Sequence, residues 1–211
     1  LENISVEISK PEKFLEQVKG LIANTDAVLL SDYAKGLFSP RIAREIIQSA
    51  KQAGKLVVAD IKPINKELFR GVNVIKSNQK EAQEMTGTEN IEEAGRLLTE
   101  YFGCDVVISR GQEGASLFGS DGAHLHIPSK KIKVFDVSGA GDTFIAALAL
   151  ALASGLGKED AITVANSAGA IVVQKPGTAT VSLEELLSTL LPNMHVENLA
   201  IVPKVWGYEK W

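Results

Sequence analysis

Residues 136–142 (DVSGAGD) combine small residues with two carboxylates, and an apolar, alanine-rich segment follows them at 143–154. The preceding segment, 131–135 (KIKVF), is predicted as a strand, so the glycines are expected at a strand-to-helix turn. Free backbone N–H groups and the positive end of a helix dipole attract anionic oxygen atoms at such a turn. The sequence therefore predicts a phosphate site at this point of the chain.

Asp142 lies at the edge of that site, where a carboxylate repels the anion that the amides attract. Its position suits an action on the other reactant, whose attacking hydroxyl would lose its proton to the carboxylate. We therefore interpret Asp142 as a general base. We interpret the amides of Gly139, Ala140 and Gly141 as the groups that stabilise charge on a transferred phosphoryl group. On this interpretation the chain is a phosphotransferase.

Two other interpretations of the motif stay open. The glycines can serve backbone geometry alone, with Asp142 as a helix cap. Gly139 and Gly141 also fit the first two positions of the dinucleotide fingerprint G-x-G-x-x-G, but Phe144 occupies the third position. No Walker A motif occurs in the sequence.

The composition limits the class of protein. With 211 residues, of which 45% are hydrophobic and 23% charged, the chain resembles an ordinary globular domain. The net charge of −4 argues against a general nucleic-acid binder, and the longest apolar run, 144–153, is too short to cross a membrane. Cys104 is the only cysteine, so we expect no intrachain disulfide and a reducing, cytoplasmic location. The three histidines show no metal-binding pattern.

Apolar segments alternate with helix-period segments along most of the chain. Strands are predicted at 27–31, 56–60, 72–76 and 105–109, and helices at 40–52, 66–69, 79–86 and 91–101. This alternation predicts a parallel sheet with helices on both faces. A β-hairpin is predicted at 115–127, and helices at 142–154, 159–174 and 182–190. We assign residues 1–191 to one domain and 192–211 to a C-terminal tail.

Polar residues follow the predicted strands, at the edge of the sheet where such folds bind their ligands. We expect these residues to share one site. They are Asp32, Tyr33 and Lys35 after the first strand, Asp60 and Lys62 after the second, Asn78 and Glu81 after the third, Arg110 and Gly111 after the fourth, and Asp142 after the last.

Several of these motifs resemble those of the ribokinase-like (PfkB) carbohydrate kinases. Residues 136–143 resemble the family's second signature, 78–81 (NQKE) match its N-x-x-E pattern, and 109–114 (SRGQEG) resemble its nucleotide-binding turn. Residues 31–36 (SDYAKG) and 60–63 (DIKP) are similar to the D-glycero-β-D-manno-heptose 7-phosphate kinase branch, which includes the kinase half of the bifunctional ADP-heptose synthesis enzyme. The resemblance implies an α/β fold, the ribokinase-like three-layer α/β/α arrangement, with a mainly parallel sheet, a β-hairpin and C-terminal helices.

Members of this family begin with a segment that carries a first signature, much of the sugar pocket and a β-strand lid. Nothing in this sequence corresponds to that segment, so we expect the lid to be absent from this chain. We therefore expect the chain to bind nucleotide and to show little sugar kinase activity by itself.

The resemblance also implies roles for individual residues, with ATP and Mg²⁺ as cofactors. The residues implied in nucleotide binding are Asn78, Glu81, Ser109, Arg110, Gly111, Gly114, Asn166 and Gly177. Glu81 would act on Mg²⁺ through a water molecule, and a helix-capping pair is the alternative for Asn78 with Glu81. Lys35, Asp32 and Lys62 would contact a phosphate or the substrate, with ordinary surface lysines as the alternative. Asp136 and Ser138 are candidate ligands of a monovalent cation such as K⁺.

The resemblance implies ATP-dependent transfer of the γ-phosphoryl group to the anomeric hydroxyl of heptose 7-phosphate. The alternatives are a PfkB kinase of another sugar or sugar phosphate, a non-catalytic nucleotide-binding remnant, and a dehydrogenase. The expected partner is a small sugar or sugar phosphate, with no nucleic acid and no membrane. We also expect a cytoplasmic homodimer.

Overall fold

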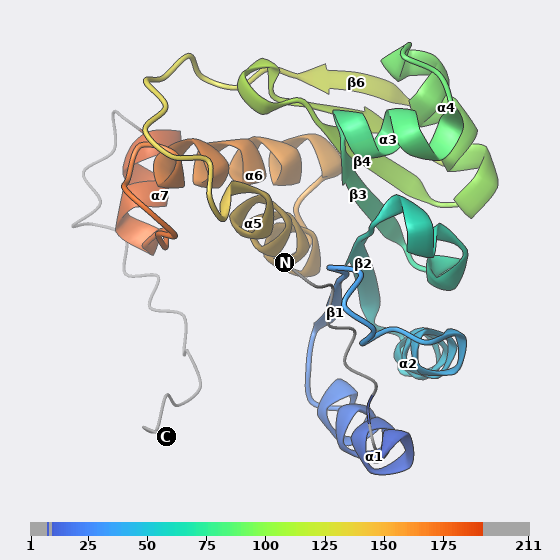
Figure 1. The fold of residues 1–211 in the computed structure, drawn as a ribbon. Helices are drawn as coiled ribbons and strands as arrows, with labels where there is room; N and C mark the ends of the chain where they lie inside the picture. The colour runs from blue at the N-terminus through green and yellow to red at the C-terminus, as the bar shows by residue number, and fades with distance from the viewer. Residues whose placement is uncertain (1–7, 9, 192–211) are drawn as a thin grey trace.

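The computed structural model describes residue 8 and residues 10–191, which contain a six-stranded sheet in the order β1-β2-β3-β4-β5-β6. The first four strands pair in parallel, and the last two form an antiparallel hairpin beside them (Figure 1). The strands are β1 (Ala27–Ser31), β2 (Leu56–Asp60), β3 (Val74–Asn78), β4 (Asp105–Ser109), β5 (Ala115–Phe118) and β6 (His124–Ile127). The predicted tail at 192–211 lies outside the described residues.

Seven α-helices and two short 3-10 helices connect and follow the strands in the described part of the chain. The α-helices are α1 (Pro11–Ile22), α2 (Pro40–Gln52), α3 (Gln79–Thr86), α4 (Ile91–Phe102), α5 (Ala140–Ala153), α6 (Lys158–Val172) and α7 (Leu183–Leu190). The 3-10 helices are η1 (Pro63–Phe69) and η2 (Gly111–Glu113). None of the described helices combines the length and the apolar character needed to span a bilayer.

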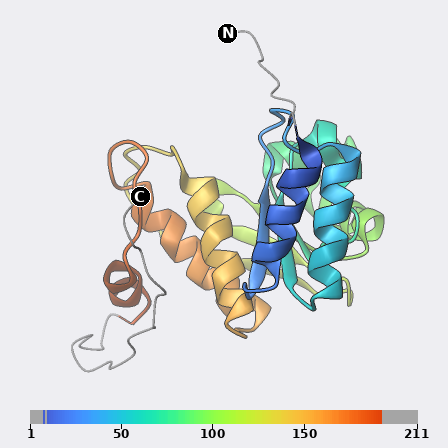
Figure 2. The same cartoon turned by 90° about the horizontal axis from the view of Figure 1, so that it is seen from below.

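Two hydrophobic cores lie on opposite faces of the sheet, because successive side chains of a strand point to opposite sides. On β2, Val57 and Ala59 belong to the core beneath α1–α4, whereas Val58 belongs to the core beneath α5 and α6. Figures 1 and 2 show these two helical layers on either side of the strands. The predicted three-layer α/β/α fold with a mainly parallel sheet is confirmed.

The helix α1 begins at Pro11 and buries Leu15 and Ile22 against the core that it shares with α2. No helix was predicted from the sequence for this segment. Proline suits the first helical position because its missing N–H would have no partner there. The helix therefore completes the layer that covers this face of the sheet near β1.

The predicted strand at 131–135 is wrong, because this segment contains no strand. Its side chains do alternate, with Ile132 and Val134 lining a cavity and Phe135 exposed. The backbone N–H groups of Phe135 and Asp136 donate to the carbonyl of Val173, at 2.7 and 3.1 Å, instead of pairing with a strand. The alternating pattern thus came from packing against a cavity and the end of α6.

The third strand begins two residues later than predicted, at Val74 rather than at residue 72. Oδ1 of Asn73 accepts a hydrogen bond from the N–H of Val57 at 2.8 Å, so a side chain takes the place of a backbone partner there. The strand ends at Asn78, which also caps α3.

Candidate active site

The loop after β1 meets the start of α5 at the carboxyl edge of the sheet. The hydroxyl of Tyr33 donates a hydrogen bond to Oδ1 of Asp142 at 2.5 Å. Both side chains are exposed, and 109 residues separate them in the sequence. The hydrogen bond to the carboxylate raises the pKa of the Tyr33 phenol above its ordinary value. Tyr33 therefore remains a donor at neutral pH.

The first turn of α5 leaves the Asp142 carboxylate free of a capping role. The N-cap is Gly139, and no side chain forms a capping hydrogen bond at this end of the helix. Asp142 lies in the first turn, where a negative charge interacts favourably with the helix dipole. The capping interpretation of Asp142 therefore lacks its hydrogen bond in this structure.

A buried ion pair lies beneath the same turn. Nζ of Lys76 on β3 lies 2.8 Å from Oδ2 of Asp60 on β2, and the two side chains are 4% and 13% exposed. Burial raises the pKa of the Asp60 carboxyl above its ordinary value, although the neighbouring ammonium opposes the shift. A Cβ atom at residue 141 would lie 3.3 Å from Nζ of Lys76, so Gly141 allows this cation to approach the amide turn.

Glu81 joins the loops after β2 and β3. Nζ of Lys62 donates to its Oε1 at 2.5 Å, and the N–H of Asn78 donates to its Oε2 at 2.9 Å. Oδ1 of Asn78 in turn accepts from the N–H of Glu81 at 2.9 Å. The two residues thus form a capping box at the start of α3, which is the alternative interpretation given to them in the sequence analysis. Burial acts to lower the pKa of the Lys62 ammonium, but Glu81 leaves it above its ordinary value.

Asp32 fixes the loop that carries Tyr33. Its buried carboxylate accepts hydrogen bonds from the N–H of Ala34 at 2.8 Å and from the side chain of Asn65 at 2.9 Å. The N–H of Lys62 adds a longer bond of 3.3 Å. Lys35 lies exposed on the same loop. Asp32 thus holds the loops after β1 and β2 in a fixed relation.

Four of the eight residues implied in nucleotide binding line a cavity of about 250 Å³ next to the amide turn, whereas Asn78, Glu81, Arg110 and Gly177 do not line it. It lies between the loop after β4, the start of α5 and the middle of α6. Ser109, Gly111, Gly114, Ala140, Gly141 and Asn166 all line it. Its remaining wall is largely apolar and includes Ile132, Val134, Phe144 and Val173. An apolar slot beside an amide turn suits a flat base joined to phosphates.

Gly114 and Arg110 shape the loop after β4. Gly114 has φ of 96°, and a Cβ atom there would lie 2.2 Å from the carbonyl oxygen of Ile127. That same carbonyl accepts from Nδ2 of Asn166 at 3.0 Å. Arg110 forms an ion pair with Glu113, while its buried Nε has no partner among the described residues. The loop is therefore fitted closely against the end of β6.

Asp136 ties the segment before α5 to the loop after α6. Its Oδ1 accepts from the N–H of Ser138 at 2.9 Å and its Oδ2 from the N–H of Gly177 at 3.1 Å. The Ser138 amide and, to a lesser extent, the Gly177 amide hold the pKa of the Asp136 carboxyl below its ordinary value. Asp136 and Ser138, the candidate cation ligands, thus lie together with Gly177, which was implied in nucleotide binding.

Residues 4–186 match the family model described as pfkB family carbohydrate kinase. The chain belongs to this family. It is 39% identical over 190 residues to bifunctional protein HldE of Bradyrhizobium diazoefficiens, a match that covers 87% of this chain and 38% of that protein. The bifunctional protein HldE of Paramagnetospirillum magneticum is 40% identical over 195 residues, covering 90% of this chain and 39% of that protein. The chain thus spans about two fifths of the length of these relatives.

Solved structures of pfkB-type kinases have the same fold. The ribokinase of Arabidopsis thaliana, solved with ribose and ATP, gives a TM-score of 0.73 at 26% identity, covering 85% of this chain and 59% of that one. Phosphofructokinase-2 of Escherichia coli, solved with potassium, gives a TM-score of 0.73 at 18% identity, covering 84% and 61%. The second likeness concerns the fold alone. Together they confirm the ribokinase-like architecture.

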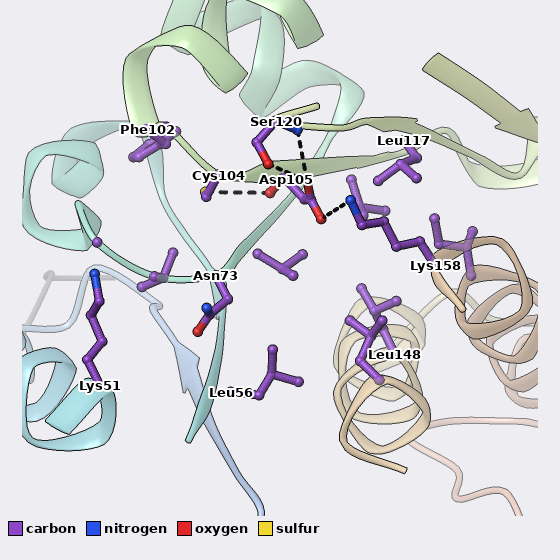
Figure 3. A pocket seen from close by; sticks show the side chains of 17 residues that line it. Lys51, Leu56, Asn73, Phe102, Cys104, Asp105, Leu117, Ser120, Leu148 and Lys158 are labelled. Atoms are coloured by element: carbon purple, nitrogen blue, oxygen red, sulfur yellow. Dashed lines mark hydrogen bonds and ion pairs between the residues drawn. The ribbon is translucent and has the colours of Figure 1, made fainter. Parts of the chain in front are cut away.

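A larger cavity of this pfkB-family chain, about 590 Å³, lies at the opposite edge of the sheet. Residues at the amino ends of β2, β3 and β4 line it, among them Asp105. Figure 3 shows Ser120 and Lys158 pointing toward Asp105, which accepts from the N–H of Ser120 at 2.9 Å and pairs with Lys158 at 2.8 Å. Asp105 and Lys158 thus neutralise each other in this cavity. The cavity contains none of the residues assigned to the candidate active site.

Three residues of the candidate site were missed or left without a role by the sequence analysis. Tyr33 and Asp60 were noted at strand ends without an assigned function, and Lys76 was treated as the last residue of a strand. A signal was present for Lys76, because a lysine within a strand of a doubly covered sheet must be buried and paired. The partner of Tyr33 had no local signal, because it lies on α5.

Proposed function

We propose that this chain forms the phosphoryl-transfer part of an ATP-dependent carbohydrate kinase, with D-glycero-β-D-manno-heptose 7-phosphate as the acceptor. The product would be the 1,7-bisphosphate, a precursor for ADP-heptose. Membership of the pfkB family supports the reaction class. The motifs at 31–36 and 60–63 support the heptose branch. The alternatives within the same site are another sugar or sugar phosphate, or nucleotide binding without turnover.

The position of Asp142 carries the proposal. Its carboxylate, free of any capping bond, stands between the nucleotide cavity and the loop after β1. An acceptor hydroxyl bound on the side of that loop would lose its proton to Asp142 while attacking the γ-phosphoryl group. The amides of Gly139, Ala140 and Gly141 would stabilise the charge that develops on that group. The buried Lys76 would add positive charge beneath them.

The residues around the cavity would hold ATP. Ser109, Arg110, Gly111 and Gly114 would follow the nucleotide phosphates. Asn166 would border the base, and Gly177 would lie in the loop that helps close the nucleotide pocket. Asn78 would lie near the phosphates.

The donor set fits a magnesium ion bound through water. Both carboxylate oxygens of Glu81 already accept hydrogen bonds, so a direct bond to the metal would displace Lys62 or the Asn78 amide. Mg²⁺ keeps several waters and takes phosphate oxygens as ligands, so it needs few protein carboxylates. The described residues contain no cluster of three or more acidic, histidine or cysteine side chains suited to a metal. When bound, Mg²⁺ would neutralise charge on the phosphates.

Charged residues near β1 and β2 would bind the acceptor or position the loops that bind it. Lys35 and Lys62 would contact its phosphate, and Asp32 would keep their loops in place through its three hydrogen bonds. We also infer that Asp136 and Ser138 take part in a K⁺ site. The whole protein would act as a cytoplasmic homodimer, which sedimentation can test.

Calorimetry and kinetics test the proposal together. The chain should bind MgATP or MgADP, and a folded sample without measurable nucleotide binding would contradict the assignment of the cavity. In the full-length protein, Asp142→Asn should keep nucleotide affinity within a few-fold and lower turnover on heptose 7-phosphate by about 10²–10⁴. Near-normal turnover of this variant would remove Asp142 from the chemistry.

A further inference from the structure

The hydrogen bond between Tyr33 and Asp142 uses only one of the two carboxylate oxygens. Oδ1 of Asp142 accepts from the phenol at 2.5 Å, and no partner of Oδ2 is found among the described residues. A carboxylate held by one oxygen has its torsion fixed while the other oxygen stays available. This is the arrangement that a general base needs before its substrate arrives.

The backbone that carries Tyr33 is itself held in place. The neighbouring Asp32 is buried and accepts hydrogen bonds from the Ala34 amide and from Asn65 on the loop after β2. Ala34 has φ of 52°, a strained value for a residue with a side chain. The loop thus adopts one tight shape that presents the phenol toward α5.

We propose that Tyr33 is a positioning residue, which orients Asp142 so that Oδ2 receives the proton of the acceptor hydroxyl. The inference rests on the proposed function and deepens it. The phenol holds the carboxylate in one orientation through its hydrogen bond to Oδ1. Its ring, 56% exposed, forms a wall on the acceptor side of Asp142.

Kinetics of Tyr33→Phe in the full-length protein test this role. The variant keeps the ring and loses the hydroxyl, so kcat should fall about tenfold while KM for ATP stays unchanged. A merely structural role would lower the fraction of active sites, measured by titration with nucleotide, without lowering kcat per active site.

Tyr101→Phe is the matched control. It removes the same hydroxyl from α4, where the Tyr101 ring packs against Arg70 and away from Asp142. This variant should keep the wild-type kcat. An unchanged kcat per active site in Tyr33→Phe, in an enzyme that does phosphorylate its sugar, would overturn the inference and leave the proposed function standing.

A second measurement does not depend on turnover. Carbon-13 NMR of tyrosine Cζ, assigned with Tyr33→Phe, follows the ionisation of the phenol. Asp142→Asn removes the negative charge next to it, so Tyr33 should ionise at lower pH than in the wild type. An unmoved titration would overturn the inference. A shifted titration in a protein that phosphorylates no sugar would instead contradict the proposed function.

Discussion

Nζ of Lys76 lies 2.8 Å from Oδ2 of Asp60, in an ion pair buried between β2, β3 and the first turn of α5. Placing two charges in a protein interior costs hydration energy, which their attraction offsets only when the geometry is good. This pair lies directly beneath the turn whose amides are proposed to hold phosphate. The Lys76 ammonium therefore both compensates the buried Asp60 carboxylate in the sheet and places positive charge near the amides of the turn.

Lys76→Met should destabilise the protein strongly. It leaves Asp60 buried without its cation, and removing one partner of a buried pair typically costs about 3–5 kcal/mol. Chemical denaturation measures the change. Arg96→Met, which breaks an exposed pair with Glu100, is the control and should cost less than about 1 kcal/mol. A loss for Lys76→Met as small as that of the control would contradict the prediction.

Much of the fold could be predicted from the sequence, because β1, β2 and β4 are short, largely apolar segments. Leu56–Asp60 is buried on both faces, so its composition alone identified it. The failure at 131–135 has a physical reason. Ile132 and Val134 alternate with exposed residues just as strand residues do, but they face a cavity. Periodicity reports which side chains are buried and not what buries them.

The candidate site was predictable where its motifs are local. Asn78 directly precedes a helix and Glu81 follows three residues later in its first turn, so their capping pair could be inferred from spacing. The contact between Tyr33 and Asp142 could not, because it depends on the loop after β1 reaching α5 across the edge of the sheet. The pairing of Lys76 with Asp60 likewise depends on the order of β2 and β3.

Asp136→Asn should change how stability depends on pH. The backbone amides lower the pKa of Asp136 in the folded state, so its ionised form contributes stability above the ordinary pKa. That contribution is lost as the pH falls through the lowered value. The urea midpoint of the wild type should therefore exceed that of the variant at neutral pH, and the difference should disappear once the pH falls below the lowered pKa of Asp136. A pH-independent difference would contradict this account.

Cys104 should resist alkylation in the folded protein. Burial, with a smaller effect of the Asp105 charge, raises the pKa of its thiol to about 12, so little reactive thiolate is present. It is the only cysteine, so labelling by iodoacetamide reports on this residue alone. We expect labelling to be at least about a hundredfold slower in buffer than in denaturant. Equal rates would mean that the cavity in Figure 3 opens readily.

Gly114→Ala should damage both stability and nucleotide binding, and Gly122→Ala provides a matched control. Both glycines have positive φ, 96° and 87°, so alanine strains either backbone by about 1–2 kcal/mol. At residue 122 a Cβ atom meets nothing within 4 Å. At residue 114 it would lie 2.2 Å from the Ile127 carbonyl and 2.5 Å from the Ser129 amide, both backbone atoms that must shift.

The shift at residue 114 should reach the cavity, because the Ile127 carbonyl also accepts the hydrogen bond of Asn166. Overpacking adds about 1–3 kcal/mol to the backbone strain, so Gly114→Ala should lose about 2–5 kcal/mol and bind MgATP more weakly. Gly122→Ala should lose only the strain energy and keep its affinity. Denaturation and calorimetry on the two variants separate these effects. Equal affinities in both variants would show that the loop after β4 takes no part in binding the nucleotide.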